Sequence, residues 1–170
     1  TEASLGFLAL ERFGFGSKQM GILFIFIAIT SIITQGVFVR RWAPRLGEAY
    51  VCGLGLLVCS LSFLVQGAAL TTPLFILSSL GVAVASGLTF PMFPSLVAKY
   101  SSADRRGENM GALRSMGALG RALGPLAAAY LYFFKGSYFL YCLCAAVCLV
   151  PFLIIIYVSR KNYRLLTIKA

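Results

Sequence analysis

The chain has 170 residues, of which 59% are apolar and 12% are charged, and its mean hydropathy is +0.88. Soluble globular proteins contain about 45–50% apolar and about 25% charged residues. This composition excludes a soluble enzyme domain, a disordered tail and a disulfide-rich secreted module. The first residue is Thr1 rather than Met, so we expect the chain to be a fragment of a longer protein.

The net charge is +10, from 15 Lys and Arg against 5 Asp and Glu. A strongly basic soluble protein often binds nucleic acid. Here the charges form short clusters between long uncharged runs, which leave no continuous basic face for a phosphate backbone. We therefore expect a lipid bilayer, and not nucleic acid, as the partner of this chain.

The uncharged runs predict membrane-spanning helices, because about 20 mostly apolar residues cross roughly 30 Å of hydrocarbon. No run alternates as a barrel strand does, so the expected fold is all-α, a polytopic transmembrane helix bundle. We predict five full spans and the end of a sixth, all in one transmembrane half-domain of residues 1–170. The predicted spans are 1–10 (partial), 20–39, 49–70, 73–98, 110–134 and 136–159, followed by a tail at 160–170.

The placement of Lys and Arg predicts the orientation of these spans, because cytoplasmic loops are enriched in both residues. Alternate connections are rich in them, so these connections and the C-terminus are predicted to be cytoplasmic. The cytoplasmic group contains Arg40, Arg41, Arg45, Lys99, Arg105, Arg106, Arg160, Lys161, Arg164 and Lys169, and the opposite group contains Arg12, Lys18 and Lys135.

Arg121 is the most informative single residue, because it lies close to the middle of the predicted span 110–134. A charge at this depth costs at least about 2.5–3.5 kcal/mol, so the side chain is expected to face a water-filled cavity or a carboxylate. It is interpreted either as part of a substrate or ion site or as a structural lock between two helices. Glu2 is a candidate partner, since the register of the partial span places it near mid-membrane.

Two more polar side chains are candidates for the same site. Arg114 lies two helical turns before Arg121 and therefore on the same helix face, nearer the predicted cytoplasmic side. It either contacts a ligand or extends to the lipid headgroups. Gln35 ends a polar stripe in the span 20–39 and is a candidate hydrogen-bonding partner for a ligand, whereas the Ser and Thr of that stripe are expected to bond their own helix.

Glycines and prolines mark two places where helices are expected to bend. Gly120 and Gly124 form a G-x-x-x-G pattern, which allows close contact between helices, and Pro125 weakens the backbone ladder next to them. Pro91 and Pro94 are expected to kink the span 73–98 and to act either as a gating hinge or as a packed kink.

The five cysteines all lie inside predicted spans. Cys142 and Cys144 have the spacing of a possible ligand pair, but the chain contains no His. We expect the cysteines to pack as small apolar residues, and we expect no metal site and no cofactor. No span carries paired carboxylates or a nucleophile with a base, so no catalytic residue and no enzyme are expected.

Three motifs resemble the C-terminal half, helices seven to twelve, of a major facilitator superfamily transporter, with most of helix seven missing. Residues 36–41, Gly-Val-Phe-Val-Arg-Arg, resemble the G-x-x-x-[DR]-R loop between helices eight and nine, with Gly36, Arg40 and Arg41 in the key positions. Residues 106–111 resemble the R-G-x-x-x-G motif that leads into helix eleven. Residues 120–125 resemble the G-x-x-x-G-P antiporter motif.

The overall pattern is most similar to the tetracycline-transporter-like branch of drug:proton antiporters, and residues 11–15, 35–36 and 112–115 resemble one member of it. The resemblance implies transport of small organic solutes by alternating access, with the site between two six-helix halves. We expect organic anions or amphipathic drugs as substrates, with proton-coupled antiport through Glu2, and the missing N-terminal half as a partner. The alternative is a non-transporting membrane scaffold or regulator in which Arg121 is a helix lock.

Overall fold

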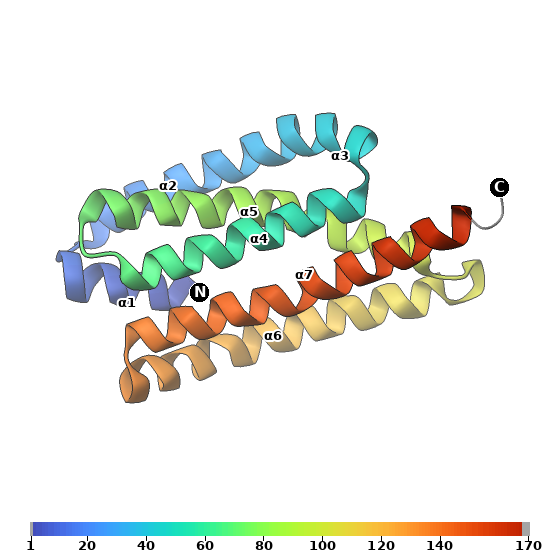
Figure 1. Ribbon diagram of the computed structural model, residues 1–170. Helices are drawn as coiled ribbons and strands as arrows, with labels where there is room; N and C mark the ends of the chain where they lie inside the picture. Colours follow the sequence, from blue (N-terminus) through green and yellow to red (C-terminus); the bar gives the residue numbers. More distant parts are fainter. Residues whose placement is uncertain (1, 168–170) are drawn as a thin grey trace.

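The computed structural model describes the backbone of residues 2–167 and the side chains of residues 5–157. Within this part, the chain consists of helices and connections, with no strand. The long helices lie side by side and alternate in direction, as Figure 1 shows. The all-α helix bundle expected from the sequence is therefore confirmed.

The helices have the following bounds: α1 Glu2–Phe13, α2 Ser17–Ile33, the π-helical segment η1 Thr34–Val39, α3 Arg40–Leu46, α4 Glu48–Ala68, α5 Thr72–Tyr100, the 3-10 turn η2 Ala103–Arg105, α6 Arg106–Lys135 and α7 Ser137–Thr167. Helix α7 continues beyond the predicted end of its span at 159, so most of the predicted tail is helical. Residues 168–170 of that tail lie outside the described residues.

Two glycines set the tight connections between antiparallel helices. Gly47, between α3 and α4, has φ 88°, and Gly136, between α6 and α7, has φ 84°. Residues with a Cβ rarely adopt this left-handed backbone, so glycine is the residue that ends a helix there at low cost. Each glycine lets the next helix begin directly and run back along the bundle.

Helix α4 is the centre of the packing, because it lies between α5 and α7 and contacts both along its length. One apolar cluster includes Leu8, Phe63, Phe75 and Tyr141 and joins α1, α4, α5 and α7. A second cluster, around Cys52, joins the other ends of α4, α5 and α7. The core of the chain is therefore built mainly from α4, α5 and α7, with α1, α2 and α6 around them.

Close helix contacts depend on glycines of α4 and α5. A Cβ at Gly55 would lie 2.7 Å from Cγ2 of Thr89, and one at Gly87 would lie 2.8 Å from Cβ of Thr34. The glycines of the motif in α6 behave differently, because Gly120 and Gly124 have no atom within 4 Å of an added Cβ. Within the described part of the chain, the small-residue face of α6 therefore makes no close helix contact.

Four stretches of helix are long and apolar enough to cross a membrane within the described residues: Ser17–Leu46, Glu48–Ala68, Thr72–Tyr100 and Ser137–Tyr157. Helix α6 is also long, at 30 residues, but it carries more charge. Its membrane crossing remains a prediction, as do the exact limits of the spans. Helix α5 continues through Pro91 and Pro94 without ending, and their role as a hinge also remains a prediction.

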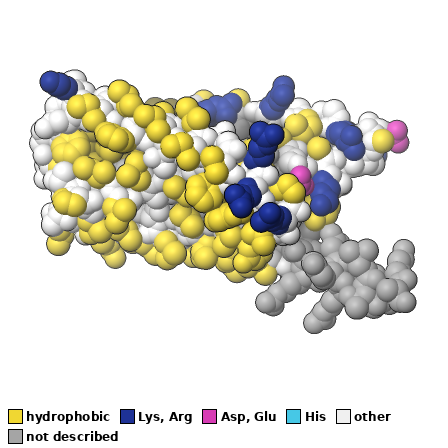
Figure 2. All heavy atoms as spheres, turned by 90° about the horizontal axis from the view of Figure 1, so that it is seen from above, with side chains coloured by type: hydrophobic (Ala, Val, Ile, Leu, Met, Phe, Trp, Pro, Cys, Tyr) yellow, Lys and Arg dark blue, Asp and Glu magenta, His cyan; other side chains and the backbone are white. Residues whose placement is uncertain are grey.

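The basic clusters lie at one end of the bundle. Figure 1 places α3, the connection between α5 and α6, and the end of α7 at the same end. Figure 2 shows most of the visible Lys and Arg side chains near that end, with few at the other. This arrangement matches the alternation of basic connections in the sequence, and the assignment of this end to the cytoplasm remains a prediction.

Replacing Gly55 by Ala tests the close contact between α4 and α5. The new Cβ would also approach Cβ of Leu88 to 3.0 Å and the carbonyl oxygen of Ala85 to 3.2 Å. We expect a loss of about 1–3 kcal/mol in the free energy of unfolding, because overpacking forces the helices apart. Gly21→Ala is the matched control, since an added Cβ there meets open space. Equal thermal unfolding of both variants in detergent would contradict the close contact.

Candidate functional site

Arg121 lies at the middle of α6, and its side chain is exposed. It makes no hydrogen bond or ion pair with any residue whose side chain the structure describes. An added Cβ at Gly117 would lie 3.4 Å from Nη1 of Arg121, so the guanidinium lies along the helix over this glycine. Because Gly117 has no side chain, the guanidinium of Arg121 has room to lie against the helix there.

Arg114 lies on the same helix, and its side chain is also exposed, without a partner among the described side chains. Two turns of helix separate the two arginines, so both project from one face. Tyr132 is the buried residue of α6, and Figure 1 shows the helix at the edge of the bundle. The structure therefore leaves two cations on a helix face that no described side chain covers.

Gln35 lies in the π-helical segment η1 at the end of α2, and its side chain is exposed. A π-helical turn changes the direction of the side chains that follow it and is frequent at functional sites. Thr34 donates a hydrogen bond to the carbonyl of Thr30 at 2.8 Å, within its own helical run as expected. The expectation is wrong for Ser31, which donates to the carbonyl of Ala83 in α5 at 3.3 Å.

Glu2 begins α1, but its side chain lies outside the described residues. Figure 1 shows that α1 starts part-way along the bundle and runs to one end. The depth of Glu2 in the membrane remains a prediction. Its pairing with Arg121 remains a prediction.

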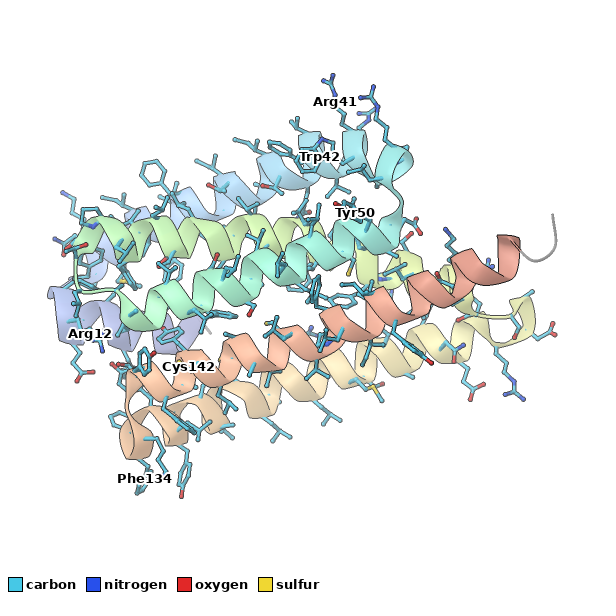
Figure 3. All side chains as sticks on the ribbon, in the orientation of Figure 1. Arg12, Arg41, Trp42, Tyr50, Phe134 and Cys142 are labelled. Atoms are coloured by element: carbon cyan, nitrogen blue, oxygen red, sulfur yellow. The ribbon has the colours of Figure 1, made fainter. Side chains whose placement is uncertain are left out.

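The predicted loop motif forms the end of η1 and the start of α3. Gly36, Arg40 and Arg41 are exposed, and Figure 3 shows Arg41 directed away from the bundle. Trp42 packs edge-on against Phe38, with ring centroids 5.0 Å apart. The predicted hinge residues lie in two environments: Gly120, Gly124 and Pro125 are exposed on α6, whereas Pro91 and Pro94 are half-buried in α5.

Two grooves between described residues lie away from the two arginines. A groove of about 410 Å³ lies between α4 and α7 and is lined by residues such as Tyr50, Gly53 and Phe152. A smaller one, of about 100 Å³, includes the buried Gln66 and Ser79, whose side chains hydrogen-bond at 3.1 Å. The two arginines instead lie on an exposed face of α6.

Arg12 has a role that the sequence analysis missed. Its Nη1 donates to the carbonyls of Gly67, at 3.2 Å, and Ala69, at 3.1 Å, and its Nη2 donates to Oγ of Ser137 at 2.9 Å. These carbonyls end α4, where unpaired acceptors and the helix dipole favour a cation. Figure 3 shows Arg12 at the end of the bundle where α1 ends. One side chain thus joins the end of α1 to α4 and α7.

Glu11, the residue next to it, accepts a hydrogen bond from the hydroxyl of Tyr132 in α6. Phe7 of α1 also packs against the rings of Tyr132 and Phe133, at centroid distances of 6.1 and 5.8 Å. The Glu11–Arg12 pair therefore fixes α1 to α4, α6 and α7 together. A basic residue in the last turn of α1 was the available signal, but its partners are distant in the sequence.

The sequence profile of the Major Facilitator Superfamily matches residues 3–167. The chain is 39% identical to Major facilitator superfamily domain-containing protein 10 of Mus musculus over 154 residues. These residues cover 91% of this chain and 34% of the relative. It is 36% identical to the protein of the same name from Homo sapiens, over 99% of this chain and 36% of the relative. This is the branch member that residues 11–15, 35–36 and 112–115 resemble.

A solved structure agrees with these relatives. The crystal structure of the human organic anion transporter MFSD10 (TETRAN) matches with a TM-score of 0.82 and 35% identity, over 91% of this chain and 37% of that one. Multidrug resistance protein 2 of Bacillus subtilis (strain 168) is 30% identical over 114 residues, which cover 67% of this chain and 28% of the relative.

The chain belongs to the Major Facilitator Superfamily. It spans about a third of the length of the curated relatives it matches. The family and its apolar helices make it part of a multi-pass membrane protein. The relatives point to a transporter and not to an enzyme.

Replacing Arg12 by Met tests the link between α1, α4 and α7. The variant loses three hydrogen bonds, so we expect a loss of about 1–3 kcal/mol in the free energy of unfolding. Lys18→Met is the control, because Lys18 is exposed at the start of α2. Thermal unfolding in detergent measures both variants. An Arg12→Met protein as stable as the control would show that the link contributes nothing.

Proposed function

We propose that this chain is the C-terminal half of a secondary transporter that moves small organic solutes by alternating access. The family supports transport, and the substrate class rests on a relative that is an organic anion transporter and on another that is a multidrug resistance protein. The chain contains no phosphate-binding loop of the G-x-x-x-x-G-K type. The proposed energy source is an ion gradient or the gradient of the substrate itself.

The proposed substrate is an organic anion or an amphipathic drug, and Arg121 is the residue that attracts it. A guanidinium in a site of low dielectric attracts a carboxylate or sulfonate several times more strongly than it does in water. The observation that carries this proposal is the exposed side chain of Arg121 at the middle of α6, which has no partner among the side chains of residues 5–157. Arg114 is a second cation along the path, and Gln35 is a neutral hydrogen-bonding partner.

The N-terminal half of the same transporter would form the other wall of the site. In this family, the substrate site lies near the membrane midplane between the two halves. The uncovered face of α6, with its arginines and its open Gly120 and Gly124, is the part of this chain that fits such an interface. We propose the same topology for this half as in the sequence analysis, with five full spans and a cytoplasmic C-terminus.

The bending points are proposed to serve the change between inward-facing and outward-facing states. Pro91 and Pro94 free backbone acceptors in α5, and Pro125 frees one in α6 next to Gly120 and Gly124. The loop with Gly36, Arg40 and Arg41 is proposed to contact lipid headgroups or the other half at the cytoplasmic end. The competing hypothesis is a non-transporting scaffold in which Arg121 is a helix lock. The candidate partner for that lock is Glu2, whose side chain lies outside the described residues.

Neutralising Arg121 in the full-length protein tests its role directly. We expect Arg121→Gln to lower anion flux about tenfold or more, because a charge-assisted interaction of about 1.5–3 kcal/mol is lost. Arg121→Lys keeps the charge and is expected to retain part of the flux. Lys135→Gln, at the exposed end of α6, is the control for net charge. Flux of a labelled organic anion into proteoliposomes is the measurement.

Two results would count against this assignment. Normal flux in Arg121→Gln would remove the arginine from the mechanism. Absence of flux in the unaltered protein at every pH, together with unchanged membrane insertion of the variants, would favour the scaffold.

Proton coupling through Glu2 predicts a distinct pH response. When deprotonated, Glu2 would pair with Arg121, and protonation would free Arg121 for the substrate. We expect Glu2→Gln to abolish the dependence of flux on an imposed pH gradient while substrate exchange continues. Glu108→Gln is the control, since Glu108 is exposed at the start of α6. An unchanged response of Glu2→Gln to the gradient would exclude Glu2 as the coupling residue.

A further inference from the structure

Two cysteines from different helices meet inside the bundle. Sγ of Cys148 in α7 lies 3.7 Å from Sγ of Cys59 in α4. Both side chains are half-buried, and both are free thiols. Cys59 lies at the middle of α4, and both residues lie within stretches long and apolar enough to span a membrane.

The packing around the two thiols keeps them facing each other. Ser60, next to Cys59, donates a hydrogen bond to the carbonyl of Ala145 at 3.0 Å, and this bond fixes the register of α4 against α7. Both cysteines pack against the apolar cluster that contains Phe63 and Tyr141. The site is therefore surrounded by apolar side chains, and an oxidant that dissolves in lipid has better access to it than one that dissolves only in water.

We propose that Cys59 and Cys148 form a modification site, a dithiol that lipid hydroperoxides convert into a disulfide between α4 and α7. A disulfide has a sulfur–sulfur length of about 2.05 Å, so the two sulfurs, now 3.7 Å apart, must approach by roughly 1.7 Å, which rotation of the two side chains would supply. Among the described cysteines, the contact between two sulfurs is that of Cys59 with Cys148. Cys52 lies in the second apolar cluster, and Cys144 lies one helical turn before Cys148 in α7.

The reaction balances without any group from the protein other than the two thiols. The sulfur of one thiol attacks the terminal oxygen of the hydroperoxide, the O–O bond breaks, and the products are a sulfenic acid and the lipid alcohol. The second thiol then attacks the sulfenic sulfur, the S–S bond forms, and water leaves with the remaining proton. Two thiols lose two electrons and two protons in total, and the hydroperoxide is reduced to an alcohol and water.

The test treats membranes containing the full-length protein with cumene hydroperoxide, a lipid-soluble hydroperoxide. The remaining thiols are then blocked with a maleimide, and the peptides are analysed by mass spectrometry without reduction. We expect a peptide pair that joins Cys59 to Cys148, lighter by two hydrogen atoms, and loss of maleimide labelling at both residues. Cys142→Ser is the matched control in α7 and is expected to leave the linkage unchanged.

The outcomes separate this site from other cysteine chemistry. Cys59→Ser and Cys148→Ser should each abolish the linkage, and the remaining thiol should become labelled or overoxidised. A linkage through Cys144 instead of Cys148 would overturn the assignment, as would full labelling of both thiols in the unaltered protein after treatment. The peptide pair that joins Cys59 to Cys148 is measured in the unaltered protein, so the test holds even if a variant does not fold. The measurement does not depend on transport.

Discussion

A guanidinium inside a membrane must meet water, an anion or a carboxylate, because hydrocarbon offers its five N–H groups no partner. Arg121 stands at the middle of a 30-residue helix, and no described side chain of this chain meets it. If α6 crosses the membrane as proposed, this position gives the helix a polar face that lipid cannot cover. The arrangement of the other helices is consistent with that requirement, since the interior is built from α4, α5 and α7 and leaves α6 at the edge.

Helix α6 is held against the bundle by α7, α5 and the end of α1. Tyr132 is the buried residue of α6, and its hydroxyl donates to Glu11. Arg12 joins the same end of α1 to α4 and α7. Close contacts at Gly55 and Gly87 keep α5 against its neighbours. A packed core of α4, α5 and α7 with an exposed face on α6 suits a site that a second domain completes, because the core holds that face in place.

The fold class and the family were predictable from the sequence, because long uncharged runs and the loop motifs are local features. Arg121 and Arg114 could be singled out for the same reason, since a charge within an apolar run is visible in one dimension. The contacts of Arg12 could not, because Gly67, Ala69 and Ser137 are far from it in the sequence. The glycines that permit close contact were also not distinguishable, because Gly55 and Gly120 differ in their neighbours and not in their own chemistry. The contact between Cys59 and Cys148 has the same origin, since two helices bring the thiols together.

The exposure of position 121 to water in the full-length protein tests the central claim most directly. A single cysteine is placed at 121, or at the exposed position Val147 of α7, in a variant whose native cysteines, including the five of this chain, are replaced. Position 147 is expected to face lipid. A water-soluble, membrane-impermeant methanethiosulfonate is then added to proteoliposomes. We expect rapid labelling at 121 and no labelling at 147. A cysteine at 121 that reacts only with a lipid-soluble reagent would contradict it.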